Sequence, residues 1–380
     1  MPGPRPPVHL VTHEFTPNIG GAGVYCQALA EGADHKGFPI TVWAAGKIDR
    51  GDTAFPFKVK RMGHRGSQGW EARFGLLRTA LGVARSAWLN PDHVVHVAEP
   101  GALAAWLYLQ MHPRLRQVRP ILTFHGSEIL RFSSLGHRRH LMRQLIGRAS
   151  RIAVLSRNNR DLLRARYPEA NGKVILTPGA PRKRAEPKPS ELPARPKRAE
   201  VVILTVGRIH PRKGQLRLIE ALTRLKKKWR KEIALWIVGP VVKRDYFRAV
   251  KAAARDSGVD VIFHHGVSEA ELTGFYRQAD IFALTSVPTG HSIEGLGLVY
   301  LEAAAEGLPV VAHETGGVAD AVVDEQTGLL VSPDDLEGLT TALKRLIKDA
   351  KLREQMGRSG QAFARQFSWE AMACQLYGDL

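Results

Sequence analysis

The amino-acid sequence predicts an α/β protein built from two Rossmann-like domains that face each other across a cleft. A length of 380 residues suits two domains, each able to bury its own sheet. Short apolar runs alternate with helix-length segments through both halves of the chain, which is typical of βα units. One stretch rich in proline and charge, 181–198, interrupts this alternation near the middle.

The first half contains six short apolar runs that we expect to form a parallel sheet. They cover 8–12, 40–44, 94–97, 121–123, 152–155 and 174–176. Nearly continuous apolar strands separated by helices indicate a sheet that is covered on both faces. We therefore assign 1–182 to a first domain.

The stretch that follows lacks any periodicity, and we expect an exposed linker over 183–199. The βα alternation then restarts with apolar runs at 201–206, 233–238, 261–263, 281–284, 310–312 and 329–331. These runs predict a second domain over 200–365. The last segment, 366–380, reads as an amphipathic helix and is a candidate to cross back to the first domain.

Cysteine content and hydropathy exclude several protein classes. Apolar residues make up 44% of the chain and charged residues 24%, which is typical of a soluble globular protein. Cys26 and Cys374 alone can build neither a disulfide framework nor a thiolate metal cluster, so we expect a reducing cytoplasm. The N-terminal residues do not resemble a secretory signal, and the longest apolar run, 101–111, is far shorter than the roughly 20 residues of a membrane-spanning helix.

The net charge of +19 is confined to the first half of the chain. Residues 1–199 hold 32 Lys and Arg against 13 Asp and Glu, whereas 200–380 hold 23 of each kind. The first domain is therefore expected to face an anionic partner, such as a phospholipid surface, an acidic glycan or a nucleic acid. A solvated basic surface without a partner explains the charge equally well.

The basic stretch 131–151 illustrates both readings of that charge. At helical spacing most of its arginines fall opposite the apolar residues: Arg138, Arg139, Arg143 and Arg148. Such a helix can lie on the inner face of an anionic membrane. It can also pack on the core and leave its arginines in solvent.

The strongest functional signal is the segment 285–309. It begins at the carboxyl end of an expected strand, passes through a glycine-containing loop and enters a helix at about Leu296. The free backbone N–H groups at a helix start suit a phosphate. Glu294 lies in the loop and Glu302 some two turns into the helix, so one carboxylate can face a sugar and the other can accept hydrogen bonds from ribose hydroxyls. The alternative is a helix start with acidic residues that only favour the helix dipole.

A second signal, Val206-Gly-Arg-Ile-His-Pro-Arg-Lys-Gly214, follows the first strand of the second domain. A diphosphate leaving group gains negative charge as the glycosidic bond breaks, and fixed cations stabilise that transition state. We expect Arg208 and Lys213 to be these cations, whereas Arg212 can be a surface neighbour. An exposed basic turn without a ligand is the alternative.

Two motifs of the first domain are weaker signals. Gly20, Gly21 and Gly23 join the first strand to the first helix, where they can let backbone approach an anionic ligand. Tight packing demands such glycines too, and the segment matches neither a P-loop nor the dinucleotide fingerprint. His125 follows another strand in Thr123-Phe-His-Gly-Ser-Glu128, although a lone loop histidine is usually structural.

No metal site is expected. The sequence contains no Asp-x-Asp and no cluster of histidine, cysteine or carboxylate residues at metal-binding spacing. We expect Arg208, Lys213 and the helix dipole to take the role of a metal ion at the diphosphate.

Glu294-Gly-Leu-Gly-Leu-Val-Tyr-Leu-Glu302 resembles the donor motif of family 4 retaining glycosyltransferases of the GT-B fold. The continuation from Glu302 to Ala312 is similar to phosphatidylinositol mannosyltransferases, and the Gly-Arg and Arg-Lys-Gly spacing resembles the same family's diphosphate site. The segment 315–320 resembles a further family signature. The stretch 177–181 departs from the family, where Asn-Gly and an acidic residue are common.

The resemblance implies that 1–182 is the acceptor-side domain and 200–365 the donor-nucleotide-binding domain. It also implies a role for each matching residue. Glu294 would contact the transferred sugar and Glu302 the ribose, while the backbone of Gly207, Gly297 and Leu298 would lie at the donor diphosphate. It also implies that His125 contacts the donor hexose and that the glycine loop lines the donor phosphate and the acceptor side. Attack would come from the face that the diphosphate leaves.

The function implied is transfer of a hexose from a nucleoside-diphosphate sugar, GDP-mannose or a UDP-hexose, to a lipid-linked or glycan acceptor. A sugar-nucleotide epimerase of the same fold is the main alternative, and the paired glutamate and basic motifs favour transfer over it. A nucleic-acid-binding protein is suggested by charge alone, because the sequence shows no stacking, zinc-finger or helix-turn-helix motif. The sequence does not predict the oligomeric state.

Overall fold

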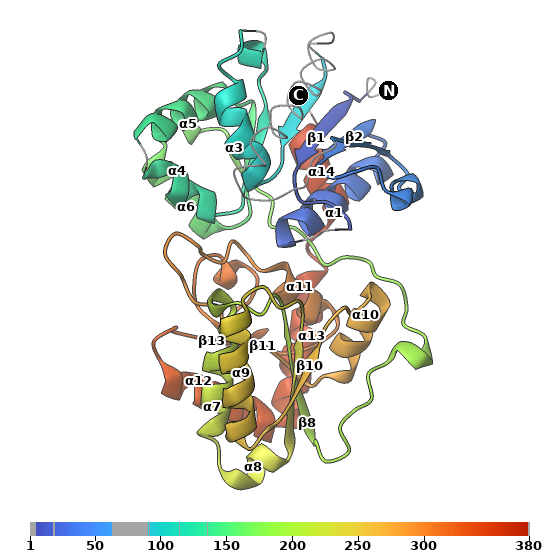
Figure 1. The fold of residues 1–380 in the computed structure, drawn as a ribbon, viewed down its shortest axis with the longest axis vertical. Coiled ribbons are helices and arrows are strands. Elements are labelled where there is room, and N and C mark those ends of the chain that lie inside the picture. The colour runs from blue at the N-terminus through green and yellow to red at the C-terminus, as the bar shows by residue number, and fades with distance from the viewer. Residues whose placement is uncertain are drawn as a thin grey trace. The chain divides into compact units, whose positions relative to one another are not determined.

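The computed structural model describes residues 5–17, 20–62, 90, 92–113, 115–134 and 136–378. The chain divides into two compact units, each with its own sheet and helices (Figure 1). Unit 1 comprises Met1–Gly179 together with Ser368–Leu380, and unit 2 comprises Ala180–Phe367.

A seven-stranded parallel sheet forms the centre of unit 1, in the order β3-β2-β1-β4-β5-β6-β7. The strands are β1 (Val8–Thr12), β2 (Ile40–Ala44), β3 (Lys58–Arg61), β4 (Val94–Val97), β5 (Ile121–Phe124), β6 (Arg151–Val154) and β7 (Val174–Leu176). All six runs predicted in this half are strands, with ends shifted by at most one residue. The sequence did not predict β3.

Strand β3 escaped prediction because it lies at the sheet edge. Three of its four residues are basic, so it shows no apolar run, and an edge strand buries less side-chain surface than a central one. Its basic side chains find local partners instead. Lys60 Nζ lies 4.1 Å from the centre of the Trp43 ring, and Arg61 pairs with Asp52 at 2.6 Å.

The helices of unit 1 are α1 (Gly21–His35), α3 (Pro100–Leu109), α4 (Ser127–Ser133), α5 (Gly136–Arg148), α6 (Arg157–Arg166) and α14 (Trp369–Tyr377). Helix α14 comes from the C-terminal end of the chain and packs on α1, where Gly32 leaves room for the backbone of Trp369. The hydroxyl of Tyr377 lies 2.7 Å from Nδ1 of the buried His96 in β4. The last segment thus completes the core of unit 1.

Unit 2 contains a six-stranded parallel sheet in the order β10-β9-β8-β11-β12-β13. The strands are β8 (Val201–Val206), β9 (Ile233–Val238), β10 (Asp260–His264), β11 (Ile281–Leu284), β12 (Val310–His313) and β13 (Gly328–Val331). Each corresponds to a predicted run, again with ends shifted by at most one residue.

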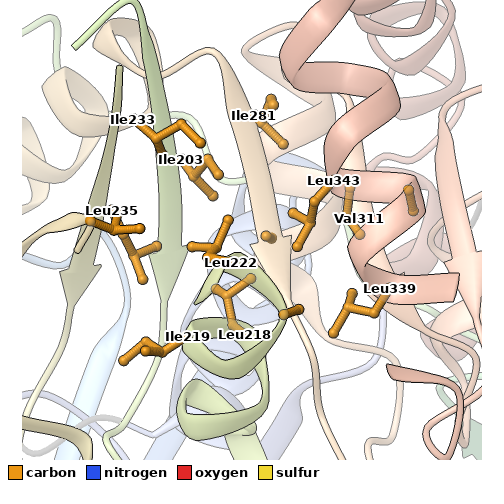
Figure 2. Packing of buried hydrophobic residues seen from close by; sticks show 14 of the residues in the cluster. Ile203, Leu218, Ile219, Leu222, Ile233, Leu235, Ile281, Val311, Leu339 and Leu343 are labelled. Carbon is orange, nitrogen blue, oxygen red and sulfur yellow. The ribbon is translucent and has the colours of Figure 1, made fainter. Parts of the chain in front are cut away.

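The helices of unit 2 are α7 (Gln215–Thr223), α8 (Lys227–Lys231), α9 (Arg244–Ser257), α10 (Glu269–Gln278), α11 (Leu298–Ala305), α12 (Leu336–Lys348) and α13 (Ala350–Ala364). Figure 2 shows Leu218 and Leu222 of α7 and Leu339 of α12 gathered with apolar side chains of the sheet, such as Ile203. Full burial of such a side chain contributes roughly 1.5–3 kcal/mol to stability. This core fixes the strands whose ends carry the motif loops.

The segment expected as an exposed linker, 183–199, is part of unit 2, and the division between the units follows Gly179. Two of its arginines pair with carboxylates on other segments of unit 2. Arg184 lies 3.0 Å from Glu269, and Arg195 lies 2.5 Å from Asp280. These ion pairs tie the connector to the unit that follows it.

The strand order reverses between β1 and β4 in unit 1 and between β8 and β11 in unit 2. In open parallel sheets, ligands bind beyond the carboxyl ends of the strands at such reversal points. The loops that leave β8 and β11 there are 207–214 and 285–297, the two strongest motifs of the sequence.

The described residues include no helix that is both long and apolar enough to span a membrane. Cys26, on α1, is a buried free thiol, and Cys374, on α14, is a partly exposed one.

Candidate active site

The loops that follow β8 and β11 meet at the carboxylate of Glu294. The β8 loop closes with a single 3-10 turn, Pro211–Lys213, and places two cations against the β11 loop. Lys213 Nζ donates a hydrogen bond to Glu294 Oε2 at 2.7 Å, and Arg212 Nη1 donates to the same oxygen at 3.0 Å. The β8 loop and the β11 loop, which are separate motifs in the sequence, therefore form one cluster of side chains.

A third donor reaches the same oxygen of Glu294. Ser286 Oγ, just after β11, lies 2.8 Å from Oε2. In the part of the chain that the structure describes, none of these hydrogen bonds goes to Oε1. Glu294 is 8% exposed, so one carboxylate oxygen is saturated by protein donors while the other can still accept a hydrogen bond from a ligand.

Two cations keep Glu294 ionised despite its burial. Burial alone would raise the pKa of Glu294, but the charges of Lys213 and Arg212 and the hydrogen bonds from Lys213 and Ser286 lower the pKa to about 2. Burial lowers the pKa of Lys213, and the Glu294 carboxylate offsets part of that fall. Glu294 is therefore a carboxylate at every physiological pH.

Backbone hydrogen bonds hold the two loops in register. The N–H of Val287 donates to the carbonyl of Arg212 at 2.9 Å, and the N–H of Gly317 donates to the carbonyl of Glu294 at 2.9 Å. The second bond comes from the segment 315–320, which resembles a family signature in sequence. That segment therefore supports the loop that carries Glu294.

Helix α11 begins at Leu298, two residues later than expected. Gly297 caps it with a φ of 85°, and a Cβ atom at this position would lie 2.4 Å from the ring of Tyr300. A glycine is required there because other residues rarely adopt such a φ and the Tyr300 ring leaves no space. The later start places Glu302 about one turn into the helix, where the sequence predicted two.

Glu302 is 4% exposed and has partners that differ from those of Glu294. Its Oε1 lies 2.6 Å from Nη2 of Arg184 and 3.8 Å from Nε of Arg182, and its Oε2 accepts a hydrogen bond from the Tyr276 hydroxyl at 3.0 Å. Sequence reasoning missed these partners. Arg184 lies in a stretch that read as solvated linker, and Tyr276 lies on an amphipathic helix where an aromatic residue suggests only core packing.

The two predicted cations have different surroundings. Lys213 is buried against Glu294, whereas Arg208 is exposed and its carbonyl accepts a hydrogen bond from Gln215 Nε2 at 3.1 Å. Arg212, left open as a surface neighbour, has a side chain only 13% exposed and contacts Glu294. The sequence offers one signal for this, because Arg212 and Lys213 stand side by side in one short turn.

The three predicted backbone contacts also differ. The N–H of Gly207 already donates to the carbonyl of Val238 at 2.9 Å, as a continuation of the β8–β9 ladder. Leu298 is the first residue of α11, and N–H groups in a first helical turn have no acceptor within the helix. The start of α11 at Gly297 and Leu298 is therefore the better candidate for a phosphate contact.

His125 lies in unit 1, between β5 and α4, and is half-buried. Its Nε2 donates to the carbonyl of Ala98 at 2.9 Å, and its ring lies edge-on to Tyr25. Its backbone N–H donates to the Glu128 carboxylate. Burial lowers the pKa of His125, and the Ala98 carbonyl and Glu99 offset part of the fall. The lowered pKa favours the neutral imidazole, and the predicted contact of His125 with the donor hexose stays a prediction.

The three glycines of the first motif open helix α1. Gly20 caps it, and Gly21 and Gly23 lie in its first turn. A Cβ atom at Gly20 would lie 2.3 Å from Glu14 Oε2, and one at Gly23 would lie 2.9 Å from the Glu14 carbonyl, whereas Gly21 has open space. Two of the three glycines therefore accommodate Glu14 within unit 1, and Gly21 is the one open to a ligand.

The sequence predicts that the cluster around Glu294 binds a diphosphate without a metal ion. In the described part of the chain, no group of three or more His, Cys, Asp or Glu side chains gathers as a metal site would need. The assignment of individual catalytic and donor-binding roles stays a prediction.

Two protein families match the chain, one in each half. Residues 19–180 match the family described as Glycosyltransferase Family 4, and residues 190–363 match Glycosyl transferases group 1. The boundary between the two matches falls in the connector.

Relatives of known activity cover nearly the whole chain. The sequence is 30% identical over 377 residues, 97% of this chain and 96% of the other, to a GDP-mannose-dependent alpha-(1-6)-phosphatidylinositol monomannoside mannosyltransferase of Mycolicibacterium smegmatis. The fold is similar to that of sucrose-phosphate synthase from Thermosynechococcus elongatus, with a TM-score of 0.77, 22% identity and coverage of 98% and 97%. It is also similar to Anabaena HepE in complex with UDP and glucose, with a TM-score of 0.72, 19% identity and 97% coverage of each chain. The predicted GT-B fold is confirmed, and the chain belongs to glycosyltransferase family 4, as a hexosyltransferase that uses a nucleotide sugar.

Proposed function

We propose that this protein transfers mannose from GDP-mannose to a lipid-linked or glycan acceptor, with retention of configuration and without a metal ion. The observation that carries the proposal is the Glu294 cluster, in which Lys213 and Arg212 are fixed against the carboxylate of the loop that leads into α11. It lies beyond the carboxyl ends of β8 and β11, where an open parallel sheet binds its ligand.

The charges of this cluster fit a departing diphosphate. Lys213 and Arg212 bring two cationic side chains and Glu294 one negative charge, so the group retains positive charge for a phosphate. The diphosphate becomes more negative as the glycosidic bond breaks, and preorganised cations then stabilise the transition state more than the ground state. The free N–H groups at the start of α11 add to this attraction. The same groups supply the charge compensation that a metal ion would otherwise provide.

The two glutamates would contact the other two parts of the donor, the transferred sugar and the ribose. Glu294 Oε2 is saturated by three protein donors, and Oε1 is left to accept a hydrogen bond from a hydroxyl of the transferred sugar. Glu302 lies about one turn into α11 and would accept hydrogen bonds from the ribose hydroxyls.

The choice of GDP-mannose follows from the Mycolicibacterium smegmatis relative, which is GDP-mannose-dependent. A panel of sugar nucleotides tests it by thermal shift, because a ligand that binds only the folded state raises the unfolding temperature. GDP-mannose in the presence of EDTA should give the largest shift, with GDP-glucose, UDP-glucose and UDP-galactose as comparison. A larger shift with a UDP-hexose would overturn the donor assignment, and a shift that requires Mg²⁺ would overturn metal independence.

Transfer requires an acceptor molecule, whereas epimerisation of a nucleotide sugar does not. The proposed activity consumes GDP-mannose only when an acceptor is present and yields the same anomeric configuration in the product, which NMR of the anomeric proton reports. An epimerase would convert the nucleotide sugar without any acceptor. Epimer formation in that control would contradict the proposal.

The acceptor would be presented at the basic face of α5. The apolar residues Met142, Leu145 and Ile146 of this helix are buried, whereas Arg139 and Arg143 are exposed. Helix α5 therefore packs its apolar side on the core, which is one of the two alternatives that the sequence left open, and its arginines lie at the surface. Anionic headgroups attract such cations, which supports contact with an anionic membrane that carries a lipid acceptor.

A further inference from the structure

The connector between the units contributes directly to the surroundings of Glu302. Arg184 lies five residues beyond Gly179, where unit 1 ends. Its side chain is 7% exposed, and its Nη2 lies 2.6 Å from Glu302 Oε1. No motif of the sequence pointed to this residue, and the proposed donor contacts do not include it.

Arg184 does more than neutralise one charge. Its Nε donates to Glu269 Oε2 at 3.0 Å while its Nη2 faces Glu302, so the planar guanidinium bridges α10 and α11. Its carbon Cζ also lies 5.3 Å from the centre of the Tyr276 ring. A guanidinium held at two edges and over a ring has one orientation, because its donors form a rigid fork.

The Glu302 carboxylate is fixed at both of its oxygens. Arg184 holds Oε1, and the Tyr276 hydroxyl donates to Oε2 at 3.0 Å. One contact would leave the carboxylate free to rotate about its last bond, whereas two contacts define its plane. An ionised carboxylate offers about four lone-pair sites, so each oxygen keeps one for a further donor. Two adjacent hydroxyls on a ribose ring match that spacing of acceptors.

We propose that Arg184 is a positioning residue of the donor site, which sets the Glu302 carboxylate in the plane that receives the ribose hydroxyls. The inference rests on the proposed ribose contact of Glu302. A buried carboxylate without a fixed partner would turn or draw in water, and its hydrogen bonds to the ribose would weaken. Arg184 acts through Glu302 and does not itself touch the substrate.

The test compares binding of GDP and 2′,3′-dideoxy-GDP by isothermal titration calorimetry, with UDP and its dideoxy form run in parallel. The ratio of their dissociation constants isolates the ribose hydroxyls. Hydrogen bonds to a charged acceptor should make the natural nucleotide bind at least roughly tenfold more tightly to the unmodified protein. In Arg184→Met, binding of the natural nucleotide should weaken about tenfold, and the ratio should fall towards one.

Arg277→Met is the matched control. Arg277 also holds the connector in place, because it pairs with Glu186 of the connector and with Glu306 at the end of α11 at 3.0 Å. Neither of these ion pairs involves Glu302. A loose connector alone would affect both variants, so the ratio should stay at the unmodified value in Arg277→Met. If Arg184→Met does not fold, Arg184→Lys keeps the charge without the fork and should show an intermediate ratio.

Each outcome has a distinct meaning. A ratio that persists in a folded Arg184 variant overturns the positioning role and leaves the ribose contact intact. Tighter nucleotide binding in Arg184→Met also overturns it, because Arg184 would then compete with the ribose for Glu302. No discrimination by the unmodified protein, with either base, removes the proposed ribose contact and the role of Arg184 together.

Discussion

Two buried glutamates of unit 1 are held by backbone N–H groups, whereas two buried glutamates of unit 2 are held by cations. Glu99 accepts hydrogen bonds from backbone N–H groups, among them that of Gly101 at 2.7 Å, and Glu128 accepts from the N–H of Gly126 at 3.2 Å. Glu294 and Glu302 pair instead with lysine and arginine side chains. These two carboxylates of unit 1 thus depend on backbone amides, and the two of unit 2 depend on cations from the β8 loop and from the connector.

The proton affinities differ accordingly. Burial raises the pKa of Glu128 to about 7, and its backbone hydrogen bonds only partly oppose the rise. Two cations overcome the same burial at Glu294 and bring its pKa to about 2. A permanent carboxylate between fixed cations suits a site that must organise charge at every physiological pH. Among the described residues, the Glu128 carboxylate has only backbone N–H donors and lacks this stabilisation of its charged form.

The largest expected effect is a loss of transfer rate when the ion pairs of Glu294 or Glu302 in unit 2 are removed. Lys213→Ala removes a cation from the proposed diphosphate site, and Glu302→Ala removes the proposed ribose contact. Loss of one preorganised group that stabilises the transition state typically costs about 10²–10³ in rate. Initial rates of mannose transfer from GDP-mannose measure the effect.

Glu128→Gln and Arg208→Ala complete that experiment. Glu128→Gln keeps an oxygen acceptor for the backbone N–H groups in unit 1 and should change the transfer rate far less. Arg208→Ala tests the prediction that this exposed residue stabilises the diphosphate together with Lys213, and a lower transfer rate is then expected. Unchanged donor kinetics in both Lys213→Ala and Glu302→Ala would contradict the site assignment.

The pH dependence of stability should run in opposite directions for the two carboxylates. Glu128 has a folded pKa of about 7, above the ordinary 4.5, so its contribution is fully present below about pH 4.5 and is lost as the pH rises through 7. Glu294, with a folded pKa of about 2, contributes fully above about pH 4.5 and less as the pH falls towards 2. Over each of these two pH ranges, the contribution of the carboxylate to the free energy of unfolding changes by about 3 kcal/mol.

Urea unfolding at a series of pH values checks this. Glu128→Gln should flatten the loss of unfolding free energy between pH 4.5 and 7, and Glu294→Gln should flatten the loss between pH 4.5 and 2. Identical pH profiles for the two variants would remove the contrast between the units.

The glycines at two helix starts should respond differently to the same change. Gly297→Ala forces a Cβ atom into the Tyr300 ring at a φ of 85° and should cost roughly 2–3 kcal/mol of stability. Gly21→Ala in α1 meets open space and should be neutral or stabilising by up to about 1 kcal/mol. Thermal unfolding of both variants measures the difference. A destabilised Gly21→Ala would show that the first motif is packed as tightly as the second.

The smallest effect concerns the surface charge of unit 1. Arg139→Gln with Arg143→Gln on α5 should weaken sedimentation with vesicles that contain anionic phosphatidylserine, by about 1 kcal/mol for each arginine. Arg248→Gln with Arg358→Gln removes two exposed arginines from unit 2 and is the matched control. Equal loss in both pairs would mean that net charge, and no particular face, drives the contact.

Much of the fold was predictable because apolar runs report buried strands directly. All twelve predicted runs are strands, and β3 was missed because an edge strand of basic residues carries no such run. The sequence singled out Glu294, Glu302 and Lys213 because their motifs follow strands that lie at sheet reversal points, and their roles in the site stay predictions. Arg212 and Ser286 were not assigned, since neither residue type at those positions reveals which oxygen it will meet.

The sequence by itself determined two α/β units, the places where their ligand loops lie and the charge difference between the halves, because each is a property of local pattern or of composition. Only the tertiary structure decided that three donors converge on one oxygen of Glu294, that helix α11 begins at Leu298, and that Arg184 crosses from the connector to Glu302. Such pairings depend on loops that the sheet order brings together from distant parts of the chain, and no short stretch of sequence carries that information.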